Sequence, residues 1–152
     1  MTGRFNRRQA MAISASGLAL AAIGISVGPA EAANDFQDLI NKFTGGKQAA
    51  EGKVKLDLPE IAENGNTVPM TVTVDSPMTE QSYVSEVLVV ADGNPRGGVA
   101  TFRFSPASGI AEANTRIRLA ATQNITAVAK MNDGSFFTTT KQVKVTIGGC
   151  GG

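Results

Sequence analysis

Residues 54–147 of this 152-residue chain predict an all-β domain folded as an antiparallel sandwich. Three observations support this fold class. Apolar and polar residues alternate with a period of two, as in Val54-Lys55-Leu56-Asp57-Leu58, which is the spacing of a strand with one buried face. Clusters of Gly, Asn, Asp and Pro separate such runs, and no helical spacing intervenes. About seven short strands in this arrangement are typical of an immunoglobulin-like antiparallel β-sandwich.

The expected strands follow one another along the chain, each bounded by a turn cluster. Residues 87–90 are continuously apolar, so their strand is expected at the centre, covered on both faces. The glycine-rich stretch 92–98 is expected to be a hairpin loop, and residues 131–135 a tight hairpin that pairs the last two strands. Arg116 and Arg118 are expected on a solvated strand edge, with a partner contact as the alternative. The seven strands are expected at 54–58, 68–74, 83–91, 99–104, 116–119, 125–131 and 136–147.

A short amphipathic helix is expected before the first strand. Asn34 or Asp35 can cap it, because both side chains accept hydrogen bonds from backbone N–H groups at a helix start. Gly45 and Gly46 end it. We expect its apolar face to dock on the sandwich. The residues of that face recur at helical spacing and are Phe36, Leu39, Ile40 and Phe43.

Residues 1–32 are predicted to be a cleaved export signal. Arginines within the first eight residues form a positive n-region, and an apolar stretch follows over residues 10–27. Glycines and serines interrupt this stretch, so it is a poor membrane anchor. Ala-Glu-Ala at 30–32 predicts cleavage after Ala32. The Arg7-Arg8 pair resembles a twin-arginine signal, which exports folded proteins and predicts a periplasmic location; an ordinary secretory signal is the alternative.

The remaining chain is expected to hold one domain, residues 33–147, followed by the C-terminal segment 148–152. Fourteen basic and thirteen acidic residues give the whole chain a formal net charge of +1. Because the signal contains several of the arginines, the domain is close to neutral, and neither nucleic acid nor a membrane is an expected partner. The chain has no histidine, which excludes His-based nucleophilic catalysis and the usual zinc sites. We predict no catalytic residue, no metal ligand and no cofactor.

The C-terminal segment 148–152, Gly-Gly-Cys-Gly-Gly, holds the only cysteine of the chain, Cys150. Glycine lacks a Cβ and adopts nearly any backbone conformation, so this segment is expected to be a flexible arm rather than a strand. A thiol on such an arm indicates a carrier of a covalently bound group. A lone cysteine allows no intrachain disulfide, and a redox enzyme would lack its resolving thiol. The arm residues beside the cysteine are Gly148, Gly149, Gly151 and Gly152.

Together these features resemble the SoxY family, the sulfur-carrier subunits of the Sox thiosulfate-oxidation system. The resemblance rests on the twin-arginine-like signal, the short helix, the all-β domain and the terminal Gly-Gly-Cys-Gly-Gly. Residues 63–69, Glu-Asn-Gly-Asn-Thr-Val-Pro, are also similar to a segment of that family. The resemblance implies that Cys150 carries thiosulfate-derived sulfur covalently in the periplasm, first as an S-thiosulfonate and then as sulfane sulfur.

The same resemblance implies a set of partners. The carrier would form a heterodimer with a SoxZ-like small β-sandwich subunit that has no signal of its own. A haem c enzyme of the SoxAX type would join thiosulfate to the thiol, and a manganese-dependent thiohydrolase of the SoxB type would release sulfate. A molybdenum/haem sulfane dehydrogenase of the SoxCD type could also act on the carrier and oxidise the remaining sulfur.

Two other hypotheses compete with this one. A ubiquitin-like thiocarboxylate sulfur carrier also ends in Gly-Gly, but it needs ATP and a cytoplasmic activating enzyme, and it has a β-grasp domain. A structural or adhesive β-sandwich would have no use for the glycine-cysteine segment. Intact-mass analysis separates the three hypotheses, because sulfur would be found on Cys150, on Gly152 or on neither.

Overall fold

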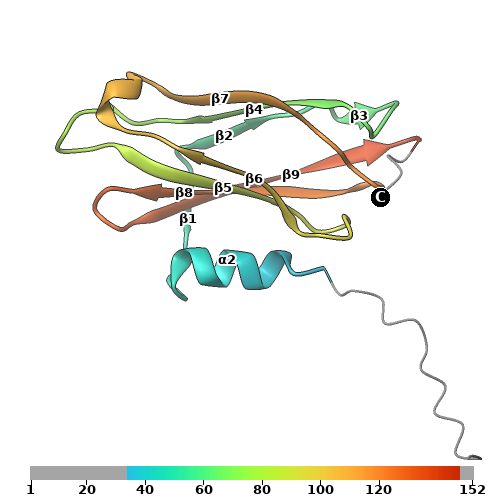
Figure 1. Ribbon diagram of the computed structural model, residues 1–152, viewed down its shortest axis with the longest axis horizontal. Helices are drawn as coiled ribbons and strands as arrows, with labels where there is room; N and C mark the ends of the chain where they lie inside the picture. Colours follow the sequence, from blue (N-terminus) through green and yellow to red (C-terminus); the bar gives the residue numbers. More distant parts are fainter. Residues whose placement is uncertain (1–33, 148–152) are drawn as a thin grey trace, which may run out of the picture. The chain divides into compact units, whose positions relative to one another are not determined.

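The computed structural model describes residues 34–147, which form two packed β-sheets and one helix on an outer face (Figure 1). The larger sheet has the strand order β1-β9-β8-β5-β6, with β3 also paired to β9, and the smaller sheet has the order β2-β4-β7. The predicted all-β sandwich is confirmed. The elements are α2 (Phe36–Thr44), β1 (Ala50–Glu51), β2 (Val54–Asp57), β3 (Ile61–Ala62), β4 (Val68–Val74), β5 (Val84–Ala91), β6 (Gly98–Arg103), a 3₁₀ turn (Pro106–Ser108), β7 (Ala111–Ile117), β8 (Gln123–Met131) and β9 (Phe136–Val145).

The core between the sheets is aliphatic, and β5 shows best how it is built. Val87 and Val89 point into this core, where both are fully buried. Side chains alternate along a strand, so Leu88 and Val90 point to the opposite face, and both are buried there beneath α2. The prediction of a central strand covered on both faces is confirmed.

Both ends of α2 follow from the residues expected there. The Phe36 N–H donates to Asn34 Oδ1 over 2.8 Å, so Asn34 supplies the hydrogen bond that starts the helix. Asp35 instead accepts a hydrogen bond from the loop after β5 and makes no side-chain cap. At the other end Gly45 has φ 63°, a left-handed conformation that suits glycine, and its N–H donates to Asn41 O.

The helix docks on the outer face of the larger sheet, as expected. The rings of Phe43 and Phe136 meet edge to face, with centroids 5.8 Å apart. Near the start of the helix, a Cβ added at Gly97 would lie 2.4 Å from the backbone nitrogen of Phe36. Only glycine permits this approach, so the glycine-rich hairpin loop between β5 and β6 also seats the helix.

Three strands differ from the expectation. β1 and β3 were not predicted, because a pair of residues shows no periodicity; both pair with β9 in the parallel sense. The bounds predicted for the strand at 116–119 are wrong, since β7 spans Ala111–Ile117. Its inward residues include Ala111 and Ala113, which are small and have a low strand propensity, so the alternation is weak.

Candidate functional site at the root of the C-terminal segment

Cys150, the glycines Gly148, Gly149, Gly151 and Gly152, and the predicted cleavage site at Ala32 lie outside the described residues. The structure does describe where the strand that leads to Cys150 ends. β9 stops at Val145, and Thr146 and Ile147 continue the chain to the last described position. We call the end of the sandwich around Ile147 the root end, and the opposite end, at the β8–β9 hairpin, the far end (Figure 1).

The root of the C-terminal segment is fixed by three hydrogen bonds. The Thr146 N–H donates to Ala62 O over 3.1 Å, and the Gly65 N–H donates to Ile147 O over 2.9 Å. The Thr146 hydroxyl donates to Glu63 O over 3.0 Å. The backbone is therefore held as far as Ile147, three residues before the cysteine.

Two of the three residues that hold the root, Glu63 and Gly65, belong to segment 63–69, which in the sequence was notable only as a family likeness; the third, Ala62, directly precedes this segment. Gly65 is buried and joins two parts of the chain, because its carbonyl also accepts the Leu119 N–H over 2.8 Å. Asn64 Oδ1 accepts the Asn66 N–H over 2.9 Å and closes the turn. The segment thus has a structural role at the root.

A cluster of polar side chains stabilises the same end. Gln123 is only 3% exposed; its Nε2 donates to Asn94 Oδ1 and to Ala121 O, over 2.9 and 3.0 Å. Its Oε1 accepts the Gly93 N–H over 2.9 Å. Asn94 Nδ2 in turn donates to Arg118 O over 2.9 Å. The β5–β6 loop is therefore tied to the connection between β7 and β8, a role that no sequence pattern revealed.

The two arginines of the β7 region are exposed, as expected for a solvated edge. Arg116 lies on β7, which is an edge strand of the smaller sheet, and its Nη1 donates to Thr67 Oγ1 over 3.4 Å. Arg118 follows the strand, next to the Leu119 that bonds Gly65. Their possible role as a partner contact stays a prediction.

The described part of the chain offers neither a cluster of metal-ligating side chains nor a membrane-spanning helix. Residues 34–147 contain no group of three or more His, Cys, Asp or Glu side chains able to hold a metal ion. Over the same residues, no helix is both long and apolar enough to cross a membrane. The root end positions a chain segment through its hydrogen bonds.

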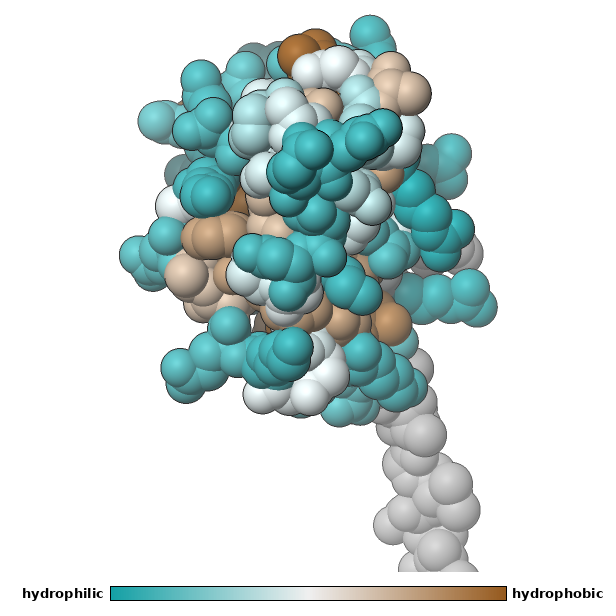
Figure 2. Space-filling model, turned by 90° about the vertical axis from the view of Figure 1, so that its left-hand side faces the viewer, coloured by the Kyte–Doolittle hydropathy of each residue, from teal (hydrophilic) through white to brown (hydrophobic). Residues whose placement is uncertain are grey.

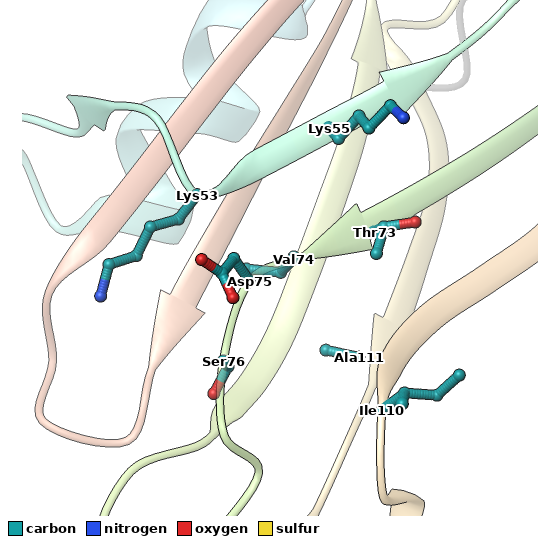
Figure 3. Close-up of a pocket in the computed structure, with 8 residues that line it drawn as sticks. All are labelled: Lys53, Lys55, Thr73, Val74, Asp75, Ser76, Ile110 and Ala111. Atoms are coloured by element: carbon teal, nitrogen blue, oxygen red, sulfur yellow. The ribbon is translucent and has the colours of Figure 1, made fainter.

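A pocket of about 350 Å³ lies at the far end, between β2, β4 and the start of β7 (Figure 3). Lys53 and Lys55 line it together with Asp75 and Ile110. Figure 3 shows the two lysine side chains pointing away from each other, so their charges do not converge on one anion. The surface of the far end is largely hydrophilic with scattered apolar spots (Figure 2). No sequence-predicted site residue lies there.

Comparison with known proteins identifies the family. The family model of the sulfur oxidation protein SoxY matches residues 40–150, which include the cysteine. The chain belongs to the SoxY family. The sulfur carrier protein SoxY from Chlorobium limicola f thiosulfatophilum has a similar structure, with a TM-score of 0.62 and 30% identity over 73% of this chain and 96% of that chain. This SoxY-family chain is therefore a sulfur carrier of the Sox system rather than an enzyme.

Other similar structures share only the fold with this SoxY-family chain. The superoxide reductase (neelaredoxin) from Ignicoccus hospitalis has a TM-score of 0.56 at 16% identity, over 62% of this chain and 80% of that chain. A putative superoxide reductase from Thermotoga maritima has a TM-score of 0.52 at 18% identity, over 68% of this chain and 89% of that chain. No curated protein matches the sequence.

Proposed function

We propose that this SoxY-family chain is a periplasmic carrier that holds thiosulfate-derived sulfur on Cys150 and presents it to partner enzymes. Segment 148–152 serves as the swinging arm. The observation that supports the proposal is the braced root: hydrogen bonds hold the backbone as far as Ile147, and the only thiol of the chain follows three residues later. The family match also extends to Cys150.

Loading forms a sulfur–sulfur bond between the Cys150 thiol and the terminal sulfur of thiosulfate. The thiol proton is released, and a haem c enzyme of the SoxAX type would act as the two-electron acceptor, which leaves a cysteine S-thiosulfonate. A SoxB-type manganese-dependent thiohydrolase then adds water across the bond to the sulfonate group. Sulfate leaves, and a sulfane sulfur remains on Cys150, where a SoxCD-type dehydrogenase can oxidise it.

The composition of the arm suits this delivery. From Ile147 to Cys150 an extended chain spans about 10 Å, which is enough to enter an active site whose mouth lies against the root. Four glycines around the thiol keep the backbone narrow, because none carries a Cβ. Since the segment contains no acidic, basic or other polar side chain, activation of the thiol is assigned to the partner enzymes.

The proposal includes one stable partner and one export route. A SoxZ-like β-sandwich subunit forms the heterodimer with this chain. The Arg7-Arg8 pair in the predicted signal directs export of the folded protein, so the partner leaves the cytoplasm with the carrier.

The test is intact-mass analysis of the heterodimer after incubation with thiosulfate and a SoxAX-type enzyme. We expect the mass of a thiosulfate-derived adduct on the peptide that contains Cys150. Cys150→Ser should abolish both the adduct and thiosulfate turnover, while the circular dichroism spectrum and Tm stay unchanged, because the serine lies beyond the braced root. Turnover retained by this variant would refute the carrier mechanism, and sulfur found on Gly152 would support the thiocarboxylate alternative.

A further inference from the structure

Two exposed isoleucines lie near the root of the arm. The side chain of Ile147 is 68% exposed and that of Ile61 is 57% exposed. Large apolar side chains are otherwise buried or half-buried in the described residues, with the single exception of Ile110, which is 65% exposed. Two of the three exposed large apolar side chains of residues 34–147 therefore lie beside the root of the arm, where a partner that receives the arm must bind.

The position of Ile61 beside the root follows from the strand register. β3 pairs in parallel with β9, so that Ile61 lies opposite Lys144 and Ala62 opposite Val145. Ala62 is buried, and its carbonyl accepts the Thr146 N–H. Because side chains alternate along a strand, Ile61 is turned outward, next to the point where the chain leaves the sandwich.

The short arm determines where an enzyme must bind. An enzyme that draws Cys150 into its active site must bring its surface to within about 10 Å of Ile147, the span of three residues. A stable interface covers about 800 Å² of each partner, a patch about 30 Å across. Ile61 lies opposite a residue only three positions before Ile147, about 10 Å along the strand, and therefore falls inside this patch.

The third exposed isoleucine, Ile110, lies outside the surface that an enzyme at the root would cover. This residue immediately precedes β7, whereas Leu119, which bonds Gly65 at the root, follows the strand. The seven residues of β7 separate the two positions by about 20 Å. Ile110 is therefore exposed to nearly the same extent as Ile61 and Ile147, but an enzyme bound at the root would not cover it, which makes it a suitable control.

The surface around the root carries charges of both signs and no patch of a single sign. The exposed charged residues near it include both signs and are Glu60, Glu63, Arg116, Arg118 and Lys144. A partner that recognised the root by charge would face attraction and repulsion in the same area. The apolar side chains are the feature that distinguishes this surface.

We propose that Ile61 and Ile147, two exposed side chains beside the root that are here called the root patch, contact an apolar rim around the active-site entrance of the SoxAX-type enzyme that loads Cys150. This inference rests on the proposed function, because it assumes that Cys150 is the loaded group. The isoleucines bind the rim while the arm enters, so they affect the affinity of the carrier for the enzyme and leave the chemical step unchanged.

The test uses Ile61→Ser and Ile147→Ser in the complete heterodimer, with Ile110→Ser as the matched control. Adduct formation is measured with a SoxAX-type enzyme and thiosulfate over a range of carrier concentrations. We expect each root variant to raise KM for the carrier about tenfold, and the double variant about a hundredfold, with kcat unchanged. Ile110→Ser should have the same KM as the wild type. Ile61→Leu and Ile147→Leu, which keep a large apolar side chain, should retain most of the affinity.

Two control measurements separate the outcomes. Alkylation of Cys150 by iodoacetamide should proceed at the same rate in every variant, and size-exclusion chromatography should show an intact heterodimer. If the root variants had the same KM as Ile110→Ser and the wild type, the proposed role of the root patch would be wrong, and the carrier function would not be affected. Loss of the heterodimer would assign these isoleucines to the subunit interface and also overturn the proposed role. A wild type that gains no adduct would refute the carrier function and the root patch together.

Discussion

The two ends of the sandwich are built in different ways. At the root end, hydrogen bonds join residues far apart in sequence, such as Thr146 and Glu63, which are 83 positions apart. At the far end, the tip of the β8–β9 hairpin is closed by the local bonds of Asp133 with Ser135, two positions apart, and its neighbour Asn132 reaches a distant residue, Gln81, 51 positions away. The hairpin tip needs only a suitable local sequence, whereas the root requires the whole sandwich to be assembled. The end that carries the arm therefore depends on the complete fold.

The hydrogen bonds at the two ends also differ in how deeply they are buried. The side-chain bonds between Gln123 and Asn94 at the root are partly buried, whereas those of Asp133 and Ser135 are exposed. A buried group that loses its partner has no water to replace it, so its loss costs more than that of an exposed bond. The predicted effects of substitution should therefore be large at the root and small at the far end.

The largest effect is expected beyond the root, in the arm itself. Replacing both Gly149 and Gly151 with valine adds β-branched bulk and stiffens the chain. If the arm must enter a narrow channel, turnover with the partner enzymes should fall by on the order of 100-fold, the cost of misplacing a reacting group. Alkylation of Cys150 by a small reagent should be unchanged. Turnover within a factor of two of the wild type would show that the glycines are not required.

An intermediate effect is expected at the root cluster. Gln123→Leu keeps the side-chain volume nearly the same but leaves the Gly93 N–H without its acceptor and removes a donor to Asn94. We expect the free energy of unfolding to fall by about 1–3 kcal/mol, measured by urea denaturation. The matched far-end variant, Ser135→Ala, should cost much less. Equal losses from the two variants would contradict the difference between the ends.

Part of this comparison could be predicted from sequence. The apolar run 87–90 identified the central strand, the turn residues 131–135 identified the far-end hairpin, and the glycines around Cys150 indicated the arm. These signals are local, since they depend on side-chain period or on backbone freedom within a few residues.

The root could not be predicted, because its contacts are not local. Glu63 and Gly65 lie in a polar turn that gives no indication of the strand it will brace. Glutamine is a polar residue that the sequence alone would place on the surface. Gln123 is buried only because the loop that contains Asn94 folds over it. Ile147 continues the apolar-polar alternation of β9, and Ile61 is an apolar residue in a two-residue strand, so the exposure of both becomes evident only once the strands are paired.

The smallest effect is expected at the far end, and it depends on pH. The Ser135 hydroxyl and N–H both donate to Asp133 Oδ1, over 2.6 and 2.8 Å, and these bonds lower the pKa of the carboxyl below its ordinary value of 3.8. A lowered folded-state pKa means that the carboxylate stabilises the folded state above pH 3.8 and that this contribution is lost as the pH falls through the folded value. Asp133→Asn keeps an acceptor for Ser135 but removes the charge, so its Tm should lie slightly below that of the wild type at about pH 6. The difference should shrink as the carboxyl is protonated, which thermal melts of both proteins between about pH 6 and pH 2.5 would measure. A difference that stayed constant over this range would show that the carboxylate charge contributes nothing to the hairpin.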